Sequence, residues 1–189
     1  MRRVIVQEFV TLDGCAAGAD GSVEFIPAST RGDQGFGRRQ VDFMGTIDAI
    51  LLGRVTYEMF AGYWPNVKEG DDDKEFADRI NAIPKVVFSR TLDRAPWGSW
   101  PDASLVKTSA AGEVAKMRQE AGKDMVIWGS LSLADSLARE GLVDEYQLIV
   151  CPIALGGGKS LFRENARFRF ANSQTFDSGV VLLAYASGK

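Results

Sequence analysis

The stretch MVIWGSLSLADSL, residues 125–137, carries the pattern that decides the fold. Its opening run of four apolar residues is typical of a strand that is buried on both faces. A glycine and a serine follow directly, and Leu133 and Leu137 then recur at helical spacing. The stretch therefore predicts a buried strand, a tight turn and an amphipathic helix in direct succession.

The same kind of strand occurs at ILLGRVTYEMF (residues 50–60) and at KVVFSRTL (residues 85–92), again followed by small or polar residues. Strands alternate with helices through most of the chain, whereas the last part contains three strands with no helix between them. This order predicts an α/β fold with a mostly parallel central sheet, antiparallel C-terminal strands and helices on both faces.

Strands are expected at residues 4–10, 49–52, 85–88, 104–107, 125–128, 145–152, 168–176 and 180–186. Helices are expected at residues 37–46, 55–60, 71–83, 114–121 and directly after the strand at 125–128. Ser130 or Ser132 can cap that last helix, which Gly141 ends. The glycine-dense segment 14–37 is expected to be a long loop. A chain of 189 residues, 46% hydrophobic and 25% charged, fits one domain that spans residues 1–189.

The chain contains no histidine, and its two cysteines, Cys15 and Cys151, are far apart in the sequence. Without histidine there is no Ser-His-Asp or Cys-His catalytic group, no His-ligated zinc or iron, and no zinc-deaminase signature. The sequence therefore predicts no metal site. Both cysteines are interpreted as small buried apolar residues.

Charge composition bears on the partners of the protein. Lysine and arginine number 22 against 25 acidic residues, and the closest approach to a basic cluster is Arg38-Arg39, so no nucleic-acid partner is expected. The N-terminal segment does not have the apolar run of a signal peptide, and no stretch approaches the roughly 20 apolar residues of a membrane span. We expect a cytoplasmic protein with no membrane partner.

Residues suited to phosphate follow three of the predicted strands, namely Gly53-Arg54, Ser89-Arg90 and Gly129-Ser130. In open α/β sheets, ligands bind beyond the carboxyl ends of the strands. Glycine permits close approach of the backbone, and a guanidinium binds phosphate oxygens in pairs. Each turn alone is weak evidence, but three together indicate a ligand with separated phosphates, such as a dinucleotide. No strand is followed by the Gly-x-Gly-x-x-Gly fingerprint of classical Rossmann domains.

The segment Gly156-Gly157-Gly158-Lys159-Ser160 looks like the end of a P-loop, but Ile153 stands where that motif requires its first glycine. We interpret the segment as a flexible loop at the mouth of a ligand site. In that interpretation Lys159 either contacts a phosphate of the substrate or is an ordinary solvated lysine.

The strings quoted above, with VTLDG (10–14) and GLVDEYQLIVCPIALGGGKSLF (141–162), resemble the dihydrofolate reductase superfamily. The resemblance is greatest to the branch that contains the C-terminal reductase domain of riboflavin biosynthesis, and it runs in order over nearly the whole chain. It implies a dihydrofolate-reductase-like fold, NADPH as cofactor and a homodimer. Dihydrofolate reductases carry a pterin-binding carboxylate in their first helix; here that position falls near Gly37 and Arg38, which argues for the riboflavin-type branch.

The resemblance also implies a set of residues that hold NADPH, which comprises Val10, Ala16, Ala17, Gly53, Arg54, Thr56, Ser89, Arg90, Gly129, Ser130, Leu131, Ser132 and Leu133. The first three would flank the nicotinamide ring, and the serine and arginine at 89–90 would hold the 2′-phosphate. Residues 53–56 would contact the pyrophosphate and adenosine side, and residues 129–133 would wrap the pyrophosphate with their N–H groups. The family often has a second glycine where Ser130 stands.

Three residues are candidates for contact with the substrate. Asp13 ends the first strand next to the expected nicotinamide, where it would orient the substrate or relay a proton; as an Asp-Gly turn residue it is equally well explained. Lys159 would meet a substrate phosphate, and Trp64 would line the pocket unless it is part of the core.

Two functions from different classes follow. The first is an NADPH-dependent reductase that acts on 5-amino-6-(5-phosphoribosylamino)uracil in riboflavin biosynthesis, or on a related pyrimidine or pterin. Hydride would pass from nicotinamide to an open-chain C1′ imine or carbonyl, with the protein aligning the reactants and excluding water. The second is a regulatory module that binds NADP(H) without turnover. The deaminase that accompanies this reductase in bifunctional enzymes needs histidine and is absent from this chain.

Overall fold

The computed structural model describes residues 1–188 of the chain. Its strands are β1 (Val4–Thr11), β2 (Cys15–Ala17), β3 (Ile47–Gly53), β4 (Lys85–Phe88), β5 (Ser104–Val106), β6 (Asp124–Trp128), β7 (Glu145–Cys151), β8 (Lys159–Ser160), β9 (Phe168–Thr175) and β10 (Val181–Ser187). Its helices are α1 (Phe25–Thr30), α2 (Gln34–Met44), α3 (Arg54–Tyr63), α4 (Lys74–Ala82), α5 (Ala110–Gln119) and α6 (Leu131–Arg139), with a short 3₁₀ helix at Trp64–Asn66.

Eight strands form one sheet in the order β5-β4-β3-β6-β1-β7-β10-β9. All neighbouring pairs from β5 to β7 are parallel, and β10 runs antiparallel to both β7 and β9. The predicted parallel sheet with antiparallel C-terminal strands is therefore confirmed. The strands β2 and β8 form a separate small antiparallel pair.

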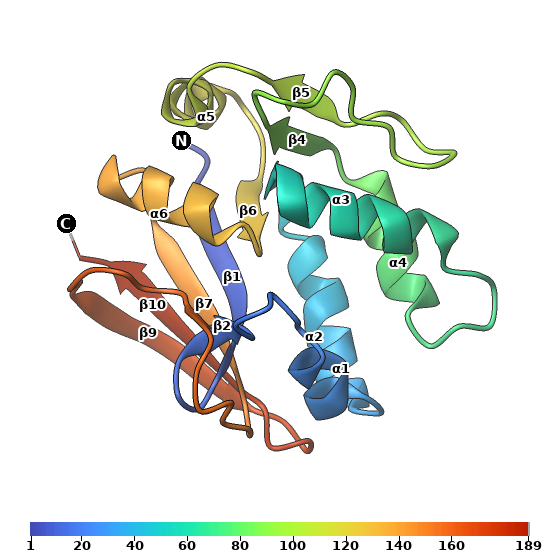
Figure 1. The fold of residues 1–189 in the computed structure, drawn as a ribbon, viewed down its shortest axis with the longest axis vertical. Coiled ribbons are helices and arrows are strands. Elements are labelled where there is room, and N and C mark those ends of the chain that lie inside the picture. Colours follow the sequence, from blue (N-terminus) through green and yellow to red (C-terminus); the bar gives the residue numbers. More distant parts are fainter. Residues whose placement is uncertain (189) are drawn as a thin grey trace.

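Alternate residues of β1 point into two hydrophobic cores, one on each face of the sheet. Val4 and Val6 belong to the core that also contains the buried side chains of α5 and α6. Ile5 belongs to the core that contains those of α2, α3 and α4. Helices cover both faces of the sheet, as predicted, and α6 and α3 lie on opposite sides of β6 (Figure 1).

The segment 14–37 is not the predicted long loop, because it contains β2, α1 and the start of α2. The Asp33 side chain accepts a hydrogen bond from the Phe36 N–H at 2.9 Å and begins α2 three residues before the expected helix. Phe25 and Phe36 are buried, so this part of the chain contributes to the core despite its glycines.

The segment 156–160 is also more ordered than predicted. Lys159 and Ser160 form β8 and pair with β2. A Cβ on Gly158 would lie 2.3 Å from the Ala17 carbonyl oxygen, so this close approach of two backbones requires glycine at that position.

The helix α6 begins and ends at its predicted positions, but its capping differs. The side chain of Ser130 makes no capping hydrogen bond. At the other end Gly141 has φ +66°, and the N–H of Leu142 donates to the Leu137 carbonyl at 3.0 Å, which is a Schellman C-cap. Within residues 1–188, no helix is long and apolar enough to cross a membrane.

Candidate functional site

The parallel strands β4, β3, β6 and β1 lie next to one another in this order, so their carboxyl ends share one edge of the sheet. At or just beyond these four ends stand Ser89-Arg90, Gly53-Arg54, Gly129-Ser130 and Asp13-Gly14. The structure therefore brings together, in a row, the segments in which the sequence predicts phosphate and nicotinamide contacts.

The middle of this row is a switch point of the sheet. The helix α3 leaves β3 towards one core, whereas α6 leaves the neighbouring β6 towards the other. Helices on opposite faces of the sheet thus start from neighbouring strands at this point. Open α/β sheets bind their ligands at such a point. Gly53 and Gly129 stand on its two sides.

Ser130 joins the end of β3 and the start of α3 to the turn after β6. Its Oγ accepts a hydrogen bond from the Gly53 N–H at 2.8 Å and lies 2.9 Å from the Thr56 Oγ1. Its own N–H donates to the Thr56 Oγ1, also at 2.9 Å. The predicted phosphate-binding amide of Gly53 is thus already paired with an oxygen of the protein. The Ser130 side chain therefore contacts Gly53 and Thr56 instead of capping α6 as predicted.

The turn at 129–130 has a demanding backbone conformation. Gly129 has φ +54°, and a Cβ there would lie 2.9 Å from the Thr56 Cγ2. Among residues 1–188, Ser130 is the single residue other than glycine with a positive φ, at +58°. Strained backbone of this kind concentrates at ligand sites. Glycine at 129 leaves room for the Thr56 side chain, and a strained turn at the end of β6 agrees with the pyrophosphate contact that the resemblance implies.

The first turn of α6 supplies N–H groups at the same place. The N–H of Leu133 donates to the Ser130 carbonyl at 2.8 Å, and the Leu133 side chain is buried. The N–H groups of Leu131 and Ser132 stand at the open start of the helix, where backbone donors attract anions. Of the five residues predicted to wrap the pyrophosphate, these two offer amides for it.

The two predicted arginines differ in their surroundings. Arg54 is paired with Glu58 one helical turn later, at 2.9 Å. Arg90 is exposed, and within residues 1–188 it takes part in no ion pair. Next to it, the Ser89 Oγ accepts hydrogen bonds from the N–H groups of Thr91 and Leu92, both at 3.2 Å. This holds the turn after β4 in shape and leaves the Arg90 guanidinium for a ligand.

The residues predicted to flank the nicotinamide lie at the β1 end of the row. Val10 is buried on β1, and Ala16 and Ala17 are buried on β2. Lys159 pairs with Ala17 across the β2–β8 ladder. The structure therefore brings this candidate substrate contact next to the expected nicotinamide position, although the two are far apart in the sequence.

The Asp13 side chain holds the loop that follows β7. Its carboxylate accepts hydrogen bonds from the N–H groups of Leu155 at 3.2 Å and Gly156 at 2.7 Å, and from the Thr11 hydroxyl. The Thr11 hydroxyl, followed by these two amides, lowers the pKa of Asp13. An ionised carboxylate holds the loop after β7 well but is a weak proton donor. Its assignment as a proton relay stays a prediction.

Trp64 is half-buried and packs in an aromatic cluster with Phe60, Tyr63 and Phe76. These contacts agree with the alternative reading of Trp64 as part of the core. A role in lining a pocket stays a prediction.

Two polar residues in the middle of β1 did not figure among the predicted site residues. Gln7 is buried and hydrogen-bonded to Gln147 at 2.9 Å, to Gln40 at 3.0 Å and to the Trp128 indole N–H at 2.8 Å. Glu8 is 6% exposed, and burial raises its pKa to about 8, opposed by the N–H groups of Phe9 and Gly129. In the sequence, a Gln-Glu pair inside an otherwise apolar strand could have indicated that both residues are buried near the site.

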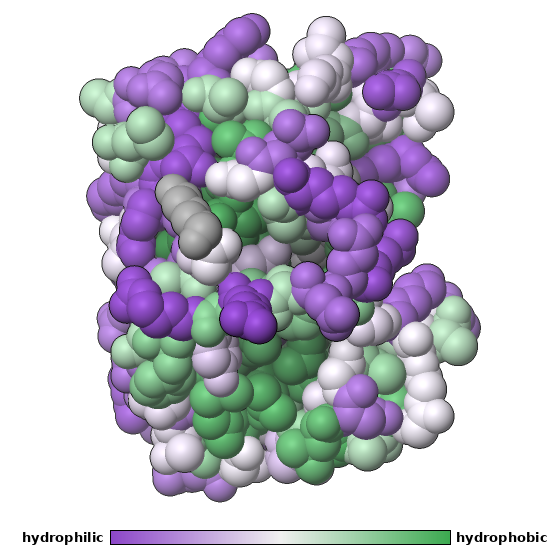
Figure 2. Space-filling model, turned by 90° about the vertical axis from the view of Figure 1, so that its left-hand side faces the viewer, coloured by the Kyte–Doolittle hydropathy of each residue, from purple (hydrophilic) through white to green (hydrophobic). Residues whose placement is uncertain are grey.

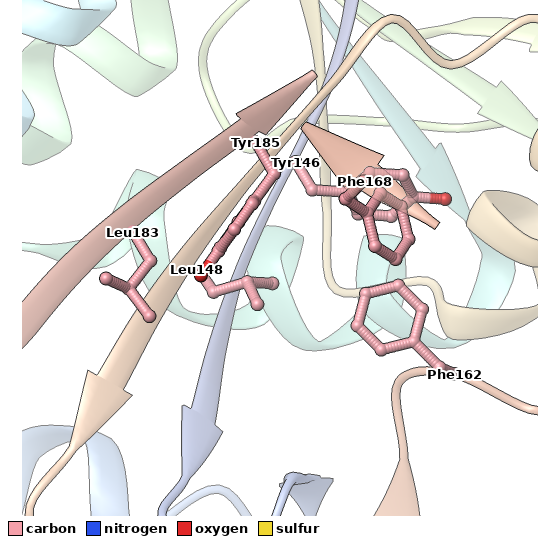
Figure 3. A pocket seen from close by; sticks show the side chains of 6 residues that line it. All are labelled: Tyr146, Leu148, Phe162, Phe168, Leu183 and Tyr185. Carbon is pink, nitrogen blue, oxygen red and sulfur yellow. The ribbon is translucent and has the colours of Figure 1, made fainter. Parts of the chain in front are cut away.

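A second surface feature lies away from this row. Figure 2 faces the side of the molecule that carries β9 and β10 and shows a hydrophobic area in its lower half. The side chains of β7, β9 and β10, with one from the loop after β8, line an apolar hollow there (Figure 3): Tyr146, Leu148, Phe162, Phe168, Leu183 and Tyr185. The hollow offers no charged group for a phosphate, so it is a poor candidate for the dinucleotide site.

Comparison with known proteins relates the whole chain to one family. The model of the RibD C-terminal domain matches residues 2–182. The uncharacterized protein YyaP of Bacillus subtilis (strain 168) is 34% identical over 187 residues, which cover 97% of this chain and 94% of that protein.

Solved structures share the fold. A putative riboflavin biosynthesis protein from Shewanella sp. PV-4 matches with a TM-score of 0.75 and 22% identity, over 99% of both chains. A diaminohydroxyphosphoribosylaminopyrimidine deaminase/5-amino-6-(5-phosphoribosylamino)uracil reductase from Thermotoga maritima matches with a TM-score of 0.67 and 15% identity. That match covers 99% of this chain and 57% of the larger protein. The fold is the dihydrofolate-reductase-like fold that the sequence resemblance implied.

Proposed function

The chain belongs to the RibD C-terminal domain family, and on that premise we propose that it is an NADPH-dependent reductase. The substrate class we propose is a pyrimidine that carries a sugar-derived imine or carbonyl, with 5-amino-6-(5-phosphoribosylamino)uracil as the first compound to test. The observation that carries the proposal is the row of strand ends at the switch point, which presents Arg90, the turn at 129–130 and Val10 in the order that a dinucleotide requires.

The residues of the chain bind and orient in this proposal. Arg90 holds the 2′-phosphate on the turn that Ser89 stabilises. The amides of Leu131 and Ser132 receive the pyrophosphate. Bound NADPH supplies a hydride, and the small pair β2–β8, whose strand β2 contacts β1, excludes water from the reacting atoms.

Binding and turnover are tested separately. NADPH fluorescence is titrated with wild type and with Arg90→Ala, and Arg79→Ala on α4, also exposed, is the control. We expect wild type and Arg79→Ala to bind NADPH alike, and Arg90→Ala to bind it at least about tenfold more weakly, which is the size of one charged hydrogen bond to phosphate. NADH should bind all three proteins equally.

Oxidation of NADPH is then followed by the loss of its near-ultraviolet absorbance with 5-amino-6-(5-phosphoribosylamino)uracil and related pyrimidines and pterins. Turnover with one of them establishes the reductase. Tight binding of NADPH without oxidation over the whole panel favours the regulatory module instead. Absence of NADPH binding to wild type contradicts both.

The apolar hollow on β7, β9 and β10 supports a second part of the proposal, a homodimer. Phe170 on β9 is 56% exposed and Phe162 is 37% exposed, and apolar area of this kind is usually covered in an assembly. Light scattering after gel filtration should give a dimer for wild type and a monomer for Phe170→Asp. A monomeric wild-type protein contradicts this part alone.

A further inference from the structure

Glu8 is a buried carboxyl at the nicotinamide end of the row. Side chains of a strand alternate between faces, so Glu8 shares its face of β1 with Val6 and Val10, which lie in the core under α6. Gln7 is paired with Trp128 in the parallel ladder between β1 and β6, which sets Glu8 beside Gly129. Glu8 therefore stands between the turn expected to hold the pyrophosphate and the residue expected to flank the nicotinamide.

One oxygen of this carboxyl is without a partner. The Glu8 Oε2 is one of three buried side-chain atoms in residues 1–188 that make no hydrogen bond. The other two are serine hydroxyls, at 178 and 187. Buried polar atoms are nearly always paired in folded proteins, and an ionisable one costs the most to leave unpaired. An acid with an unpaired oxygen at this place can hydrogen-bond to a ligand bound there.

Within residues 1–188, no charged side chain pairs with the Glu8 carboxyl. The pKa of Glu8 is raised by burial and lowered by hydrogen bonds from the N–H groups of Phe9 and Gly129. The elements packed around it do carry titratable residues, but none of them contributes to its pKa. These are Cys15 on β2, Asp124 on β6, Asp135 and Arg139 on α6, Glu145, Tyr146 and Cys151 on β7, and Lys159 on β8.

We infer that Glu8 is the proton donor of the reduction, a catalytic residue that none of the comparisons assigns. The inference rests on the proposed function, because it needs a nicotinamide cofactor in the row of strand ends. It moves the proton-transfer role from Asp13, whose carboxylate is already engaged by two amides and a hydroxyl, to a carboxyl that keeps its proton near neutral pH.

The substrate carbon receives a hydride, with its electron pair, from the reduced nicotinamide cofactor. The π electrons of the C=N or C=O bond move to the nitrogen or oxygen, and that atom takes the proton of Glu8. Glu8 is left as a carboxylate next to the oxidised, positively charged ring, and it regains a proton from water when the products leave.

This chemistry has a consequence for binding alone, without any substrate. The oxidised cofactor carries a positive ring, which favours the ionised form of a nearby carboxyl, whereas the reduced cofactor is neutral there. Binding of NADP⁺ near neutral pH should therefore release a proton from Glu8, and binding of NADPH should not.

Calorimetric titration at pH 7 in two buffers of different ionisation enthalpy counts the protons released per ligand bound. We expect about one more proton released with NADP⁺ than with NADPH in wild type, and no difference between the two ligands in Glu8→Gln. The exposed Glu140→Gln, at the far end of α6, should behave as wild type. Where a substrate is found, Glu8→Gln should lower kcat by about 100-fold or more with little change in the affinity for NADPH.

The outcomes separate the two proposals. Equal proton release in wild type and Glu8→Gln overturns the role of Glu8 while the cofactor site stands. Failure of wild type to bind either form of the cofactor overturns the proposed function, and this inference with it. Should Glu8→Gln not fold, infrared difference spectra of wild type decide: loss of a protonated carboxyl band with NADP⁺ but not with NADPH supports the inference, and an unchanged band refutes it.

Discussion

Replacing Glu8 with glutamine should make the protein more stable, and increasingly so as the pH rises. The side chain keeps its shape, and a neutral amide takes the place of an ionisable group that is 6% exposed. In the folded protein the pKa of Glu8 is about 8, against 4.5 for the free side chain. The folded state therefore holds the proton more tightly than the unfolded state does.

The sign of the pH dependence follows from this difference. Below pH 4.5 the carboxyl is protonated in both states, and Glu8 makes no pH-dependent contribution. Between pH 4.5 and about 8 the unfolded state loses its proton first, so the free energy of unfolding falls as the pH rises. The full difference corresponds to about 5 kcal/mol as an upper limit. Relaxation around the charge reduces it, and we expect a gain of about 2–3 kcal/mol at pH 8.

Urea unfolding of wild type and Glu8→Gln between pH 4.5 and 8.5 measures this gain. The midpoints should coincide at the acid end and separate by about 1 M urea at the alkaline end. Glu140→Gln, an exposed isosteric change, should follow wild type throughout. Midpoints of Glu8→Gln that run parallel to those of wild type over the whole range would refute the burial of an ionisable Glu8.

Three further substitutions test the site. Ser130→Ala removes the acceptor for the Gly53 N–H and should cost about 1–2 kcal/mol in urea unfolding; no loss would show that this hydrogen bond is unimportant. Asp13→Asn removes the carboxylate that holds the loop after β7, so the amides of that loop should exchange with solvent faster; unchanged exchange contradicts this role of Asp13. Because the pKa of Asp13 is lowered, the same loosening should occur in wild type as the pH falls below about 4. Gly158→Ala places a Cβ against the Ala17 carbonyl and should lower the thermal midpoint by several degrees; an unchanged midpoint means that β2 and β8 do not pack as described.

The larger strands could be predicted because they are buried on both faces, which leaves continuous apolar runs such as 49–52 and 125–128 in the sequence. The short strands β2 and β8 could not, since they are defined by their pairing with each other rather than by a local pattern. The helix α2 was predicted to begin three residues too late because Gly35 lies in its first turn, where glycine is a poor indicator of helix.

The candidate site could be predicted from the sequence as a set of segments, but the contacts between those segments could not. Gly53, Arg90 and Gly129 are candidates because they stand at the ends of buried strands. That Ser130 bridges to Thr56 depends on β3 and β6 being neighbours, which no local pattern states. Glu8 was missed because a polar residue in a strand is ordinarily a solvent-facing one, and only the position of β1 in the middle of the sheet buries it.

A crystal structure of the protein with NADP⁺ would show directly whether the row of strand ends binds the cofactor. We expect the 2′-phosphate on Ser89 and Arg90, the pyrophosphate at the turn 129–130 and the start of α6, and the nicotinamide against Val10 with the Glu8 carboxyl next to it. A dinucleotide bound in the apolar hollow of β7, β9 and β10, or with its 2′-phosphate away from Arg90, would contradict this expectation.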